Sequence, residues 1–302
     1  MREGATITVM IVLRRQTRRF FGPSYDAVFR LVFGDPAHID LLASLLSDSL
    51  ELPGSQVDGL QILNPQVPAT RYRSKEVVLD VLAESEARLF DLEMQNRWTS
   101  DLFERLWCYN GKMLGEQARR GAPFTGLKPV TTAVITDFSV ADHFGEYHHR
   151  TVAHDHHRGR CFAPVFDPGG VHVLELPTAR WAAEDTPATR WLRFIGARTE
   201  REMTMAAQSD PKIARAADLV RQYNADDATY YELIAHEKWL WDSHSRERDA
   251  RQEGHHEGRE EGREEERQAN ARNALYEGLS VEQVARITGL SVDEVTRLSA
   301  KD

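Results

Sequence analysis

The chain has 302 residues, of which 41% are hydrophobic, and a formal net charge of −9. This length is enough for one large domain, or for one domain with appendages. The acidic balance excludes a basic field over the whole surface, of the kind that binds nucleic acid without specificity. Two cysteines, Cys108 and Cys161, are too few for a disulfide framework and lack zinc-motif spacing. A reducing, cytoplasmic compartment is therefore expected.

Residues 1–23 are predicted to be a disordered N-terminal extension. Their apolar run, from Ile7 to Leu13, is much shorter than the ~20 residues that span a bilayer. Four arginines follow the run, whereas a signal peptide carries its positive charge before the apolar stretch. We therefore expect no membrane segment.

Two amphipathic helices are predicted next, from Tyr25 to Gly34 and from Asp40 to Leu50, because apolar residues recur there at helical spacing. Asp26, in the first of them, has two interpretations. It is either an additional carboxylate of a polar site or an acid that stabilises the start of a helix.

Two runs with strand character follow, Glu76–Ala83 and Arg88–Asn96, and the turn between them is short enough for a hairpin. Alternation places the apolar side chains of the second run on one face. The opposite face carries Asp91, Glu93 and Gln95.

The register of this hairpin decides which polar groups meet. A turn centred between Glu86 and Ala87 sets Asp80 opposite Glu93, a two-residue slip sets it opposite Asp91, and a one-residue slip turns Glu93 away. Two carboxylates on strands about 4.8 Å apart repel each other unless a cation lies between them. Such a pair suits Mg²⁺ or Mn²⁺. A solvent-facing strand edge explains the same residues, and their spacing alone does not decide.

Two later segments carry less information. Six histidines fall between His143 and His157, but none has zinc-motif spacing, so we interpret this region as a polar hairpin or loop. Residues Pro187 to Trp241 have a mainly helical pattern, in which aromatic residues at helical spacing indicate core packing.

The composition changes sharply after residue 242. Residues 243–272 hold nine acids and seven arginines, and alanine is their only apolar residue type, so we predict a solvated, partly helical spacer. Residues 273–302 regain apolar periodicity, with capping-box spacing at Ser280 and at Ser291, which predicts a small helix-turn-helix-like unit. Its net charge of −2 favours helical packing or oligomerisation over DNA binding.

The stretch from Tyr25 to about Trp191 resembles the Rpn family of recombination-promoting nucleases, a transposase family of the PD-(D/E)XK superfamily. The resemblance rests on the first helix through Asp35, on Leu79-Asp80-Val81 followed by Leu92-Glu93-Met94-Gln95, and on the helix from Phe103 to Tyr109. Strand-like runs at 129–138 and 173–176, the charged spacer and the C-terminal unit are also similar to that family.

The resemblance implies an α/β fold over residues 24–242, with a restriction-endonuclease-like core whose mixed central sheet is flanked by helices. It implies a metal-dependent DNA endonuclease linked to recombination or mobile DNA. Asp80 and Glu93 would bind Mg²⁺ or Mn²⁺, and Gln95 would orient water or phosphate. Gln95 stands where the superfamily pattern has lysine, and a neutral amide forms hydrogen bonds but supplies no charge.

Four further residues are accessory candidates beside this site. Lys75 or Arg73, just before the first strand run, would supply the missing charge. Arg105 and Tyr109 share one helix face, either as phosphate contacts or as an arginine packed over an aromatic ring.

The missing lysine and the acidic balance favour an alternative, a catalytically weak or inactive nucleic-acid-binding or interaction protein that retains the nuclease fold. DNA is the expected partner of an enzyme or a binding protein. A third interpretation is a platform for protein interaction, and self-association into a homo-oligomer is left open.

Overall fold

The computed structural model describes residues 18–63, 80–118, 120, 123–140, 145–151, 154–155, 160–161 and 169–299. The chain divides into two compact units, Met1–His236 and Glu237–Asp302. No helix in these described ranges is both long enough and apolar enough to cross a bilayer.

A mixed sheet forms the centre of the first unit, with six strands among the described residues in the order β1-β2-β3-β4-β8-β5. Its central strands run parallel and are buried almost throughout, as parallel strands covered on both faces are. They are β3 (Leu89–Gln95), β4 (Val130–Thr136) and β8 (Gly169–Glu175). The flanking strands pair antiparallel, and they are β1 (Gln61–Ile62), β2 (Val81–Glu84) and β5 (His148–Arg150).

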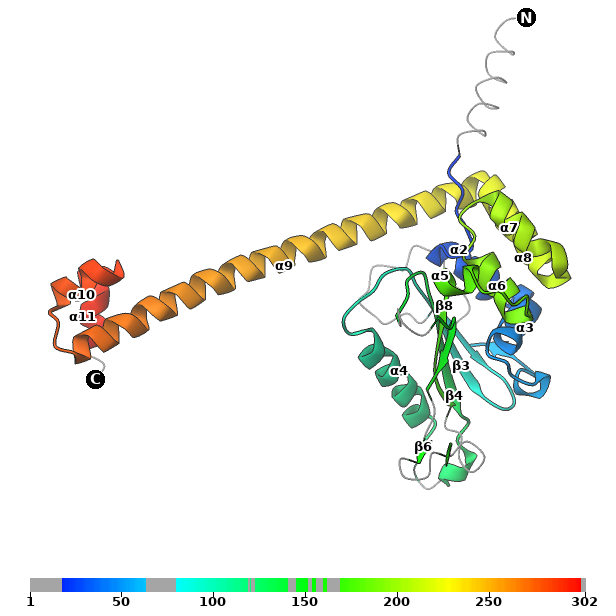
Figure 1. The fold of residues 1–302 in the computed structure, drawn as a ribbon, viewed down its shortest axis with the longest axis horizontal. Helices are drawn as coiled ribbons and strands as arrows, with labels where there is room; N and C mark the ends of the chain where they lie inside the picture. The colour runs from blue at the N-terminus through cyan, green and yellow to red at the C-terminus, as the bar shows by residue number, and fades with distance from the viewer. Residues whose placement is uncertain are drawn as a thin grey trace, which may run out of the picture. The chain divides into compact units, whose positions relative to one another are not determined.

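Helices cover both faces of the sheet, with α4 on one side of the strands and α3 on the other (Figure 1). On the first face, α4 (Leu102–Glu116) packs Leu102 and Leu106 against valines of β4 and β8. On the second face, α2 (Asp26–Phe33) and α3 (Ile39–Ser49) bury their apolar sides against Phe90 and Leu92 of β3. This arrangement confirms the predicted α/β fold with a mixed sheet flanked by helices.

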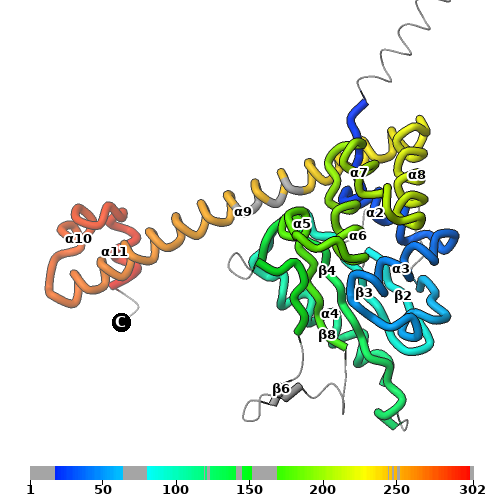
Figure 2. The backbone as a smooth tube through the Cα atoms, turned by 45° about the vertical axis from the view of Figure 1, so that its right-hand side comes forward, coloured from blue at the N-terminus to red at the C-terminus, as the bar shows by residue number. Residues whose placement is uncertain are grey.

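The remaining helices of the first unit extend the second face, where α7 and α8 lie close to α2 in both views (Figure 2). They are α5 (Leu176–Arg180), α6 (Pro187–Ile195), α7 (Glu200–Ala206), α8 (Pro211–Ala225) and the first turns of α9 (Asp227–Tyr276). Trp191 is fully buried against Phe33, so the aromatic residues predicted to be core do pack there, although Trp239 and Trp241 stay exposed.

The β2–β3 hairpin adopts the register in which the turn is centred between Glu86 and Ala87. Val81 pairs with Leu92 and Leu82 with Asp91, so the same series places Asp80 opposite Glu93. Backbone bonds within the turn, where the Ser85 N–H donates to the Arg88 carbonyl at 2.8 Å, fix this alignment. Because the apolar face of β3 enters the core, a slip by one residue would bury three polar side chains there.

Two predicted segments have different boundaries in the structure. Residues 18–23 are the described part of the predicted N-terminal extension, and Phe21 is buried among them in contact with Tyr25 and Tyr230. Packing of the core therefore begins before residue 24. The predicted spacer, residues 243–272, lies entirely within α9 and is helical throughout.

The described histidine-rich residues form short strands. His148 and His149 belong to β5, and β6 (His154–Asp155) pairs with β7 (Arg160–Cys161). The predicted polar hairpin therefore exists in its described part, whereas His143, His156 and His157 lie outside it.

The end of the second unit is a small helical cluster. Helices α10 (Val281–Thr288) and α11 (Val292–Ser299) bury Val284 and Val295 together with Ala271. Ser280 and Gln283 form the predicted capping box, and Gly289 ends α10 in the left-handed conformation that glycine favours. The Glu294 carboxylate accepts from the Ser291 N–H at 2.7 Å, which repeats the capping pattern at α11.

Candidate active site

The carboxyl end of β3 brings together the two acids that the sequence analysis selected. Asp80 immediately precedes β2, and its Oδ2 accepts a 2.7 Å hydrogen bond from the backbone N–H of Met94 on β3. Glu93 lies on β3, at the position that the hairpin register sets opposite Asp80. Both side chains are buried, with exposed fractions of 9% and 7%. The hairpin register therefore holds two carboxylates beside each other with little access to water.

An arginine from α2 binds the first of these acids. The Arg30 Nε lies 3.2 Å from Asp80 Oδ1, and the Arg30 guanidinium also pairs with Asp26, four residues earlier on the same helix. The buried His236 of α9 lies beside Asp26, with 3.7 Å between His236 Nε2 and Asp26 Oδ2. Asp26 thus joins the site through Arg30, while sequence reasoning missed both Arg30 and His236.

A second set of contacts extends from Glu93 to α4. Gln95 Nε2 donates to Glu93 Oε2 at 3.5 Å, and Arg105 Nη2 donates to Gln95 Oε1 at 3.3 Å. The guanidinium of Arg105 therefore brings positive charge next to the amide that stands in the lysine position. Burial raises the pKa of Tyr109, one turn further along α4, so its hydroxyl stays protonated at neutral pH.

Asp91 is a third buried acid, two residues before Glu93 on the same strand face. Its side chain is fully buried, and hydrogen bonds with Thr132 and Glu93 act against the rise of its pKa. The alternation of the strand predicts this face for Asp91, where it is the partner of Asp80 in a register slipped by two residues. Its spacing of two from Glu93 is the only signal in the sequence that groups the two residues.

Burial and mutual repulsion disfavour the charged forms of these acids. Burial raises the pKa of Glu93 to about 8, and the charge of Asp91 adds to the shift. Burial and then the charge of Asp80 raise the pKa of Asp91 to about 7. Burial, followed by the charges of Asp26 and Glu93, raises the pKa of Asp80 despite the opposing charge of Arg30. These acids therefore hold their protons more strongly than ordinary carboxyl groups do, and a cation bound between them would favour their charged forms.

The donor set fits a hard divalent cation. Mg²⁺ needs only one or two protein carboxylates because it keeps several water ligands, and Asp80 and Glu93 supply two. No group of three or more acidic, histidine or cysteine side chains in the described ranges is arranged as a metal site. The fit rests on the two buried carboxylates that the hairpin register sets opposite each other, with the buried Asp91 on the same strand face as Glu93.

Other candidates lie elsewhere or outside the described residues. Lys75 and Arg73 fall in the undescribed range 64–79, so the structure does not place them. At the far edge of the sheet, His148 Nε2 lies 2.9 Å from His172 Nδ1, and His149 Nε2 lies 3.4 Å from Glu175 Oε1. These histidines hold β5 against β8 and show no zinc-site arrangement among the described residues.

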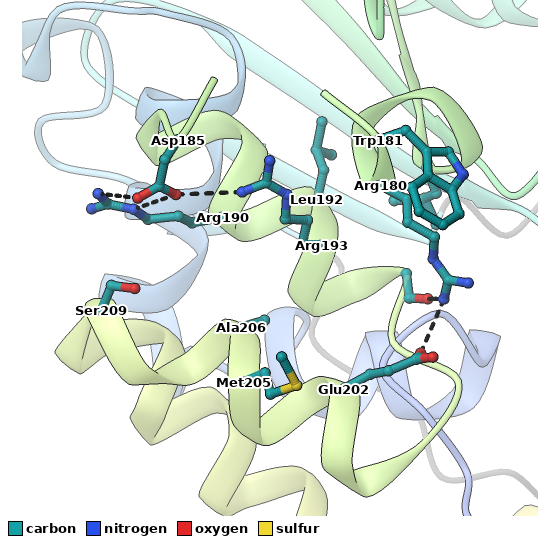
Figure 3. Close-up of a pocket in the computed structure, with 12 residues that line it drawn as sticks. Arg180, Trp181, Asp185, Arg190, Leu192, Arg193, Glu202, Met205, Ala206 and Ser209 are labelled. Atoms are coloured by element: carbon teal, nitrogen blue, oxygen red, sulfur yellow. Dashed lines mark hydrogen bonds and ion pairs between the residues drawn. The ribbon is translucent and has the colours of Figure 1, made fainter. Parts of the chain in front are cut away.

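A separate cavity of about 420 Å³ lies among α5, α6 and α7 (Figure 3). Its arginines are paired within the chain, because Arg190 binds Asp185 through two hydrogen bonds and Arg180 binds Glu202 at 3.0 Å. The acids Asp80 and Glu93 are not among its lining residues. Because these charges are paired within the chain, we assign no function to this cavity.

Comparison with known protein families places the chain in a nuclease family. A family model described as PD-(D/E)XK nuclease family transposase matches residues 23–250, which is most of the chain. No curated protein and no solved structure gives a significant match.

Proposed function

We propose, from the premise that this chain belongs to the PD-(D/E)XK nuclease family transposases, that it is a metal-dependent endonuclease that hydrolyses DNA phosphodiester bonds during recombination or DNA mobilisation. The observation that carries this proposal is the pair of buried, facing carboxylates, Asp80 and Glu93, with Gln95 on the same strand face. A buried acid pair is costly to a protein unless a partner neutralises it, so its presence favours a functional role.

Each side chain has a distinct role in this proposal. Asp80 and Glu93 would hold Mg²⁺ or Mn²⁺, an ion that lowers the pKa of bound water and neutralises charge on a scissile phosphate. Gln95 is neutral and orients water or phosphate through hydrogen bonds, while Arg105 fixes its amide. Arg30 and the Met94 N–H hold the Asp80 carboxylate in place.

Plasmid nicking with added Mg²⁺ or Mn²⁺ tests the proposal. Asp80→Asn and Glu93→Gln keep the shape of each side chain but remove its charge, and each is expected to reduce nicking by roughly 100-fold or more. Glu84→Gln is a matched control, because Glu84 lies at the end of β2 that is remote from Asp80, and its carboxylate pairs with Lys128. Equal nicking by all the variants and the unchanged protein would overturn the site assignment.

A second candidate, a DNA-binding protein with little or no cleavage activity, is favoured by the glutamine at position 95. The side chain at that position carries no positive charge, because it is an amide and not a lysine. Arg105 contacts this amide as a hydrogen-bond donor. Salt-dependent DNA binding by the unchanged protein, with no nicking in either metal, would favour this candidate over the enzyme.

A further inference from the structure

An exposed tryptophan lies just beyond the candidate active site. Trp98 follows Gln95 by three residues, a stretch of chain that spans at most about 10 Å. More than half of its side chain, 54%, is exposed to solvent. The indole therefore presents a large aromatic surface to solvent close to the site.

Two phenylalanines hold the indole in position. The ring centroids of Phe103 and Phe138 lie 6.3 Å and 5.9 Å from that of Trp98, at interplanar angles of 64° and 89°. Both phenylalanines pack against the apolar cluster beneath α4. Neither ring lies parallel to the indole, so these two contacts fix its orientation without stacking on it.

The segments that hold this aromatic group also contact Gln95, whose amide donates to Glu93. Phe138 follows β4, and the N–H of the preceding Asp137 donates to the Gln95 carbonyl at 3.0 Å. Phe103 lies in the first turn of α4, two residues before Arg105, which donates to the Gln95 side chain. Trp98 therefore packs against the two segments that contact Gln95, one at the end of β4 and one at the start of α4. It follows the end of β3, the strand that carries Glu93.

We propose that Trp98 stacks on an unpaired nucleobase of the DNA strand whose scissile phosphate would bind to a metal ion held by Asp80 and Glu93. The faces of bases inside a duplex are already covered by their neighbours, whereas an unpaired or extruded base offers a free face to an aromatic ring. The preferred substrate is then single-stranded or locally unpaired DNA. This inference rests on the proposed nuclease function and names its substrate class.

DNA binding measured in EDTA tests the stacking separately from cleavage. The probe is a short fluorescein-labelled oligonucleotide, used single-stranded and as a duplex, with fluorescence anisotropy as the readout. Trp98→Leu is expected to weaken single-strand binding by roughly 10-fold and to leave duplex binding almost unchanged. Trp98→Phe keeps an aromatic face and should retain most of the affinity, which shows that a lost fold is not the cause.

Trp181→Leu is the matched control, because Trp181 is 83% exposed but lines the separate cavity of Figure 3. It should bind both probes as the unchanged protein does. Equal weakening of both probes by Trp98→Leu, or no weakening of either, would overturn the stacking proposal.

The two proposals fail in different ways. If the unchanged protein never nicks DNA but its single-strand binding depends on Trp98, the nuclease proposal fails and the stacking contact stands. If it nicks DNA in a Glu93-dependent manner and Trp98→Leu binds both probes normally, the stacking contact fails and the nuclease proposal stands.

Discussion

At the scale of single residues, burial explains why the acids of this site differ from ordinary surface acids. An acid whose pKa is raised in the folded state binds more protons when folded than when unfolded. Its contribution to stability is therefore complete at low pH and is lost as the pH rises through the raised pKa. The pKa of Glu93 is raised from 4.5 to about 8, so its contribution to stability is lost between pH 4.5 and about pH 8.

We therefore expect the unfolding free energy of the metal-free protein to fall with pH across this interval, by on the order of 1 kcal/mol per pH unit for the coupled acids. Excess Mn²⁺ should reduce or reverse the slope, because the ion stabilises the charged forms. Urea unfolding at a series of pH values, in EDTA and in Mn²⁺, measures both slopes.

Two histidines have the opposite effect on the pH dependence of stability. The contribution of the acids must therefore be separated from theirs with variants. Burial lowers the pKa of His148 and of His236, so their contribution to stability increases as the pH rises through their ordinary value of 6.5. The contribution of the acids is the difference between the unchanged protein and Glu93→Gln or Asp91→Asn. Identical slopes in all three proteins would contradict the assignment of raised pKa values to these acids.

At the scale of elements, alternation and helical periodicity predicted the parts of the site that depend on local sequence. The observed hairpin register is one of the three that the sequence left open, and the polar face of β3 followed from the spacing of Asp91, Glu93 and Gln95. The capped helices at Ser280 and Ser291 were likewise predictable, because a capping box is local.

Contacts between distant elements were not predictable from these patterns. Arg30 reaches Asp80 from another helix, and His236 reaches Asp26 from a helix more than two hundred residues later. The complete burial of Asp91 depends on α4 covering that face, which no spacing within β3 encodes. The composition of residues 243–272 predicted a partly helical segment without a core, whereas in the structure the whole segment is helical and Ala271 near its end is buried in the cluster of α10 and α11.

The position of α4 depends on one buried amide. Asn110 Nδ2 donates to the Val130 carbonyl at 2.9 Å and to Thr132 Oγ1 at 3.3 Å, which ties the helix to β4. Asn110→Ala would leave both acceptors buried without this donor, so we expect the unfolding free energy to fall by about 1–3 kcal/mol. Chemical denaturation measures the change.

Asn96→Ala serves as the matched control, because the exposed Asn96 amide makes one hydrogen bond, to the Ser24 carbonyl at 3.0 Å. Its effect should stay within about 0.5 kcal/mol, as for most surface substitutions. Because α4 also carries Arg105, Asn110→Ala should lower nicking activity as well. Equal stability of the two variants would show that Asn110 does not anchor the helix.

At the scale of the whole molecule, the core of the first unit is separate from the apolar cluster of the second. Tyr230 and Leu233, in the first turns of α9, belong to the first core, whereas Ala271, Val284 and Val295 form a cluster of their own. Residues 243–302 also carry −4 of the net charge of −9. Residues 243–302 therefore add acidic charge to the protein, and the first core contains none of the described residues of this range.

A shortened chain of residues 1–242 should consequently keep the unfolding free energy and the metal-dependent nicking of the full chain. Its affinity for DNA at low salt should be slightly higher, because acidic residues that repel phosphate have been removed, and this gain should disappear as salt is added. Ending the chain at Asp226 instead removes Tyr230, Leu233 and His236 from the core, so that variant should be markedly less stable. Loss of nicking in the 1–242 chain, with its stability intact, would contradict this division and show that the second unit takes part in cleavage.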